Sequence, residues 1–139
     1  MSDWSARLAD MALACADAFP CEQARRLREL RELLASAPSL LSSITVPDRA
    51  TYAALLRAEA WESAALSLLG DDCGYMLSRG TGGRVMASIV LPGADEESTA
   101  SADTAALAIA AALATALRDT PMRVADRAQS APFAAMRLN

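Results

Sequence analysis

The stretch that decides the fold is Trp61–Leu117, WESAALSLLGDDCGYMLSRGTGGRVMASIVLPGADEESTASADTAALAIAAALATAL. It divides into a helical segment that stops at Gly70, two strands joined by a glycine-rich turn, an acidic loop and a very apolar helix. Helical spacing at both ends and alternation in the middle predict an α+β fold. The stretch contains no catalytic motif, so it indicates a fold and not a reaction.

The last part of this stretch, residues 102–118, is the strongest helix prediction in the chain. Ser101 or Asp103 can cap its N-terminus, because a short side-chain oxygen accepts from the free N–H groups of the first turn. From residue 105 to residue 117 only Thr115 is polar, and a helix that is apolar all round is usually buried on several faces. These 13 residues span roughly 20 Å, too short for a bilayer core of about 30 Å. We therefore expect a buried helix and no membrane span.

Cys73–Ser78 and Arg84–Leu91 are predicted to form an antiparallel hairpin. Apolar residues alternate along the second strand, and the Gly80–Gly83 turn is typical of a hairpin loop. A phosphate-binding loop would lead into a helix, whereas this one leads into a strand. A two-stranded ribbon is marginally stable alone and has open edges. We therefore expect helices on one face and either the N-terminal hairpin or a second subunit on the other.

The N-terminal part predicts a helical hairpin, with helices at Ser2–Ala18 and Cys21–Ala37 and a corner at Phe19-Pro20. Ser2 is a plausible N-cap of the first helix. Apolar residues recur every three or four positions in both helices. The face expected to be buried in the first helix consists of Trp4, Leu8, Met11, Cys15 and Phe19.

A connector, Pro38–Asp48, leads to a third helix that Asp48 can cap. The apolar positions continue to Leu69, either in one helix or in two pieces broken near Glu59, and Gly70 ends the segment. This organisation predicts an N-terminal hairpin with connector at 1–47, an αββα domain at 48–119 and a tail at 120–139.

Composition narrows the classes of function. The chain has no histidine, all 13 basic residues are arginine, and the net charge is −4. Three cysteines, Cys15, Cys21 and Cys73, lack CxxC spacing, which favours reduced thiols and argues against zinc. The first ten residues lack the pattern of a signal peptide, so we expect a protein of the bacterial cytoplasm without cofactor or metal.

The same residues argue against an enzyme. A catalytic site needs a nucleophile, a base or a metal, and no histidine is present to act as the base. Asp71 and Asp72 beside Cys73 should raise the pKa of its thiol, which is the wrong direction for a nucleophile. The acidic turn also lacks the closing Glu of a calcium loop. The sequence therefore predicts a non-enzymatic protein.

Two groups of charged or polar residues are candidate contact sites. Four arginines on the second helix could meet an anion or nucleic acid, but Glu29 and Glu32 between them favour a solvated helix face. The acidic loop at 95–97 could instead meet a basic partner protein. The candidate partner-binding residues are Asp71, Asp72, Thr81, Arg84, Asp95, Glu96 and Glu97, and the candidate anion contacts are Arg25, Arg26, Arg28 and Arg31.

Ala64–Leu117 resembles small phage and prophage proteins of alphaproteobacteria that carry an αββα unit, the phage ABA-sandwich domain. The resemblance rests on AALSLLGDDCGYMLSRGTGGRVMASIVLPG and DTAALAIAAALATAL. Residues 104–113 fit the family's T-x-A-L-A-x-x-A-A-L closing-helix pattern, and Gly74-Tyr75 stands where an aromatic pair is usual. The resemblance implies a fold and a phage origin, and it assigns no chemistry to any residue.

These observations support three functional hypotheses. The first is a small phage-type protein that binds and inhibits a host protein, such as an anti-CRISPR or other anti-defence protein. The second is a homo-oligomeric structural or assembly protein, favoured by the surplus of apolar helix surface. The third is a weak nucleic-acid-binding module, which the acidic balance disfavours. We expect a homodimer with no membrane contact.

Overall fold

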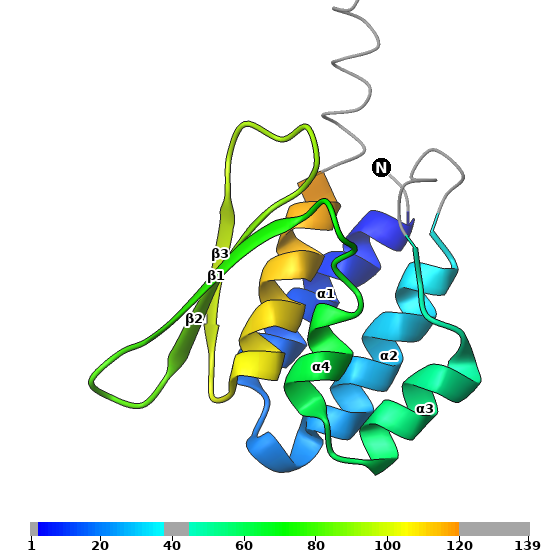
Figure 1. Cartoon of the computed structure of the whole chain (residues 1–139). Coiled ribbons are helices and arrows are strands. Elements are labelled where there is room, and N and C mark those ends of the chain that lie inside the picture. Colours follow the sequence, from blue (N-terminus) through cyan, green and yellow to red (C-terminus); the bar gives the residue numbers. More distant parts are fainter. Residues whose placement is uncertain (1–2, 38–44, 120–139) are drawn as a thin grey trace, which may run out of the picture.

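The computed structural model describes residues 3–37 and 45–119, which form a three-stranded antiparallel sheet with helices on one face (Figure 1). The closing helix, residues 105–119, lies between this sheet and the remaining helices. The predicted α+β class is confirmed. Among the described helices none has the length and apolar content needed to cross a membrane.

The N-terminal helical hairpin is confirmed with shifted bounds. Helix α1 spans Asp3–Asp17, and a 3-10 turn at Pro20–Glu22 precedes α2 at Gln23–Ala35. The turn forms because the Glu22 carboxylate accepts from the Phe19 N–H at 2.8 Å. The expected cap Ser2 lies outside the described residues, and Phe19, expected in the buried face, is exposed at the corner.

The segment predicted as a third helix forms two helices, α3 at Arg49–Arg57 and α4 at Trp61–Leu66. Of the two alternatives, the break near Glu59 is therefore confirmed, and Glu59 itself has a positive φ of 55°. The predicted cap is also confirmed, because the Asp48 carboxylate accepts from the Thr51 N–H at 3.3 Å.

The sheet has one strand more than expected. Strands β1 (Gly74–Arg79), β2 (Val85–Val90) and β3 (Ser98–Ala102) are ordered β1-β2-β3, so the predicted β1–β2 hairpin is confirmed, whereas the expectation of only two strands was wrong. Strand β3 consists of serine, threonine and alanine, whose similar hydropathies give no apolar–polar alternation. Pairing with β2 defines it, including a 3.0 Å hydrogen bond between the hydroxyls of Ser88 and Thr99.

The closing helix begins later than predicted because β3 occupies its expected first residue. Its cap is Thr104, whose Oγ1 accepts from the Leu107 N–H at 3.2 Å and donates to Gln23 Oε1 at 2.9 Å. Neither Ser101 nor Asp103 caps the helix: Ser101 lies in β3, and Asp103 pairs with an arginine.

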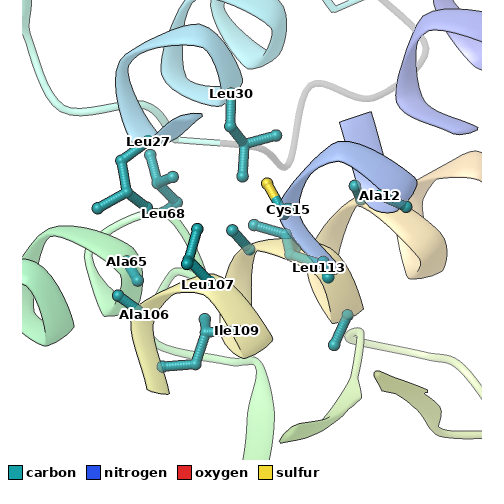
Figure 2. Close-up of a cluster of buried hydrophobic side chains, with 14 of the residues drawn as sticks. Ala12, Cys15, Leu27, Leu30, Ala65, Leu68, Ala106, Leu107, Ile109 and Leu113 are labelled. Atoms are coloured by element: carbon teal, nitrogen blue, oxygen red, sulfur yellow. The ribbon is translucent and has the colours of Figure 1, made fainter. Parts of the chain in front are cut away.

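The predicted burial of the closing helix is confirmed. Every residue from Ala106 to Ala114 is buried. Figure 2 shows Leu107 pointing toward Leu27 of α2, whereas Ile109 leaves the opposite side of the helix. Alanine side chains allow both neighbours to approach closely, so the helix forms the centre of a core that includes residues from both sides of position 47.

Candidate interaction surface

Exposed apolar side chains gather on β1 and β2. All six residues of β1 are exposed, including Tyr75 at 52% and Met76 at 68% of their full area. Leu77 of β1 and Met86 and Val90 of β2 extend this surface. In the described residues only two other large apolar side chains, Leu13 and Phe19, are exposed, and they lie on α1 and its corner. The sheet therefore carries the main exposed apolar surface.

The register places the side chains of β1 on two faces. Tyr75 lies opposite the buried Ile89, so it points to the side of the sheet that the helices cover. Met76 lies opposite Ser88 and points to the outer side. Because even Tyr75 is half exposed, the helices cover β2 but leave β1 largely uncovered.

The hydrogen-bond pattern shows which backbone groups of β1 do not pair with β2. The Gly80 N–H donates to the Arg84 carbonyl at 3.0 Å, so Gly80 and Arg84 form a hydrogen-bonded pair. Antiparallel ladders alternate hydrogen-bonded and non-hydrogen-bonded pairs. The N–H and C=O groups of Tyr75, Leu77 and Arg79 therefore point away from β2, along the free edge of the sheet.

The two edges of the sheet differ in the contacts that cover them. At the β3 edge, Arg84 of the hairpin donates to the carbonyls of Ala16 at 3.2 Å and Ser101 at 3.1 Å, and forms an ion pair with Asp103 at 2.9 Å. These bonds tie the sheet to the C-terminal end of α1. Native proteins protect exposed edges with charges, prolines or bulges, and residues 74–78 contain no charge and no proline.

The sequence-predicted partner-binding residues divide between opposite ends of the sheet. Since Gly74 lies opposite Val90, the turn with Asp71 and Asp72 is at the same end as the 95–97 loop. Thr81 and Arg84 are at the other end, roughly 20 Å away for a six-residue strand. These residues therefore do not form one patch, and Arg84 is occupied by the contacts given above.

Charged side chains of opposite sign, none of them in an ion pair within the described residues, stand at the two ends of β1. Arg79 is the last residue of β1, and Asp71 and Asp72 shortly precede its first. Within residues 3–37 and 45–119, none of these three side chains forms an ion pair. They remain available for a partner.

Sequence reasoning identified the two aspartates but missed Arg79 and the apolar residues between them. The pattern that could have indicated these residues is a strand without charge or proline at positions 74–78.

The arginine-rich face of α2 is largely neutralised by its own helix. Glu22 pairs with Arg25 at 2.7 Å and with Arg26 at 3.4 Å, and Glu32 pairs with Arg31 at 2.6 Å. The backbone N–H of Phe19, followed by Arg25 and Arg26, holds the pKa of Glu22 below its usual range. Arg49, followed by Arg31, does the same for the pKa of Glu32. The interpretation as a solvated, ion-paired face fits this geometry better than a nucleic-acid contact.

A groove of about 540 Å³ lies between α1 and α2 beside this face. Its walls mix arginines with acidic residues, including Arg7, Asp10 and Glu29. A second hollow of about 420 Å³ lies where α4, the end of β1 and the start of the closing helix meet, with Glu59, Glu62 and Arg79 in its wall. Sequence reasoning missed both hollows, because their residues come from distant segments. Neither has a charge pattern that selects one ligand.

Burial raises the pKa values of the two buried thiols and of the buried phenol. Burial raises the pKa of the Cys15 thiol to about 12 and also raises the pKa of Cys73 and Tyr52. The expected direction for Cys73 is confirmed, but its expected cause was wrong: burial raises this pKa, and Asp71 and Asp72 do not. In the described part of the chain, no three acidic or cysteine side chains group as a metal site.

Comparisons with protein-family models, curated proteins and solved structures find no match to this chain. The resemblance to phage proteins therefore stays a prediction from the sequence, and the candidate surface rests on its own geometry.

Proposed function

We propose that this protein is a non-enzymatic interaction module that binds another polypeptide through β1. The observation that carries the proposal is an exposed strand whose outward N–H and C=O groups have no strand beside them within residues 3–37 and 45–119, and whose central side chains, Tyr75, Met76 and Leu77, are apolar. Extended segments add to such edges through main-chain hydrogen bonds, and side-chain pockets supply specificity.

Two narrower hypotheses follow from different observations. The phage resemblance supports a host protein as the target, with inhibition of that protein, as in an anti-CRISPR or other anti-defence protein, as the outcome. The unprotected edge of β1 also supports the alternative of a homo-oligomeric structural or assembly protein. Both use the same strand, so a change that blocks the edge tests the common proposal.

Leu77→Pro is a specific edge-blocking change. Leu77 lies at a non-hydrogen-bonded position with respect to β2, so its N–H points to the free edge and proline there removes no bond within the sheet. Proline is tolerated on edge strands at such positions. Leu77→Ala is the matched control, because it trims the same side chain and keeps the N–H.

The experiment uses tagged full-length wild type, Leu77→Pro and Leu77→Ala in nuclease-treated bacterial lysate, with mass spectrometry of what is retained. Any retained protein is then purified and its binding measured directly. We expect binding by wild type and Leu77→Ala and loss with Leu77→Pro. Equal binding by a folded Leu77→Pro protein would contradict a role for the edge.

A further inference from the structure

Strand β1 is complementary to a second copy of itself. An antiparallel copy reverses the strand direction, so the start of β1 in one chain lies beside the end of β1 in the other. Arg79 of each copy then approaches Asp71 and Asp72 of the other, and these three side chains have no ion pair within the described residues. Such complementarity chiefly sets orientation and association rate.

The hydrogen-bond pattern limits the registers in which two copies of β1 can pair. Residues opposite each other must both point their backbone groups at the partner strand or both point them away. Tyr75, Leu77 and Arg79 point to the free edge, so each must face a residue of the second copy whose backbone groups also point to that edge. Two registers then overlap most of β1: one centred on Met76 facing Met76, and one centred on Leu77 facing Leu77.

Side-chain chemistry separates these registers. With Met76 facing Met76, Tyr75 faces Leu77 of the second copy, so apolar side chains meet on both faces. With Leu77 facing Leu77, Tyr75 faces Arg79 and Met76 faces Ser78, so every apolar side chain except Leu77 meets a charged or polar one. The first register also keeps the aspartates closer to Arg79.

We propose that the protein forms a homodimer through β1, with Met76 facing Met76 across a two-fold axis and six strands in one continuous sheet. This inference rests on the proposed function and names its polypeptide partner as a second copy. The dimer pairs the open β1 edge of each chain and leaves the β3 edges, tied to α1 by Arg84, at the outside. Its outer face joins Met76 and Met86 of both copies into one apolar surface on which a further partner can dock.

The contact is short, so the affinity should be moderate. Stable interfaces bury about 1,200 to 2,000 Å², and one six-residue strand edge supplies the lower part of that range at most. We expect a dissociation constant in the micromolar range, measurable by sedimentation velocity between about 1 and 500 μM. Leu77→Pro should weaken dimerisation at least about tenfold, since each copy loses an edge hydrogen bond. Leu77→Ala should weaken it less.

Disulfide trapping tests the register. In a background with the exposed Cys21 replaced by serine, Met76→Cys places two thiols on directly facing residues of a non-hydrogen-bonded pair, within the distance that a disulfide requires. Ser78→Cys is the matched control, because Ser78 is on the same face but faces Gly74 of the second copy in this register. We expect covalent dimer from Met76→Cys under mild oxidation and at least about tenfold less from Ser78→Cys.

The outcomes separate this inference from the proposed function. A wild-type monomer at every concentration, or faster cross-linking of Ser78→Cys, would overturn the Met76-centred dimer. If the monomer nevertheless binds another protein and Leu77→Pro prevents it, the edge proposal stands with a different occupant. If Met76→Cys forms a covalent dimer and no other protein binds, the result supports the Met76-centred dimer. It also favours the homo-oligomeric alternative over a host-protein target.

Discussion

Two apolar stretches of this chain differ in how far the fold buries them. Residues 106–114 of the closing helix are buried throughout, whereas Tyr75, Met76 and Leu77 of β1 are exposed. The helix lies between the sheet and the other helices, so packing surrounds it (Figure 1). Strand β1 is at the end of the sheet order, and β2 is its one neighbour among the described strands. An apolar sequence therefore indicates residues that are stabilised by burial. Their position in the fold decides whether the same chain buries them or whether they stay exposed to a partner.

The largest expected effect comes from making the same substitution in both stretches. Leu107→Ala removes a fully buried side chain at the centre of the core, and should lower the free energy of unfolding by about 2 to 5 kcal/mol. Leu77→Ala should lower it by clearly less, because 37% of the area of Leu77 is already exposed.

Urea unfolding followed by circular dichroism, at a concentration low enough to keep the protein monomeric, measures both values. A similar loss of stability in the two variants would show that β1 is covered within one chain, and the comparison would fail.

High pH should destabilise the buried core. Burial raises the pKa of Cys15 from 9.0 to about 12, so above pH 9 the unfolded chain releases a proton that the folded chain retains. The free energy of unfolding should be undiminished below pH 9 and then fall by about 1.4 kcal/mol per pH unit up to about pH 12 for this group alone. Tyr52, whose pKa is also raised, adds to the slope in the same direction.

Cys15→Ala should reduce this slope even though it also lowers stability at neutral pH, so slopes and not absolute values are compared between pH 9 and 11. The chain has no lysine that would titrate in this window. If the pH dependence of stability has the same slope in Cys15→Ala as in the wild type, the Cys15 thiol is not buried in the core.

The smallest expected effect concerns one hydroxyl within the core. Tyr52 is 1% exposed, and its hydroxyl has no hydrogen-bond partner among the described residues. Tyr52→Phe should therefore leave the free energy of unfolding unchanged or raise it by up to about 1 kcal/mol. Trp4→Phe is the contrasting variant, because Trp4 Nε1 donates to the Leu33 carbonyl at 2.8 Å. Thermal unfolding should show a loss for Trp4→Phe only; a clear loss for Tyr52→Phe would reveal a bonded hydroxyl.

The parts of the fold that sequence reasoning predicted correctly have strong local patterns. The closing helix has continuous apolar sequence, β2 alternates, and Asp48 caps α3 through a residue three positions away. The part it missed, β3, has small side chains without contrast, so neither alternation nor propensity marks it. The candidate site was found only in part, because Asp71 and Asp72 were visible as charges while the exposure of Tyr75 and Met76 depends on which strand is at the edge.

The sequence by itself determined the α+β class, the burial of the closing helix and the absence of a histidine base, because these depend on composition and short-range periodicity. Tertiary structure alone decided that β3 joins β2, that Arg84 bonds to Ala16 from 68 positions away, and that β1 is left open. These features depend on contacts between distant segments, which no local pattern encodes. The open edge, and with it the proposed dimer, is therefore a property of the folded chain.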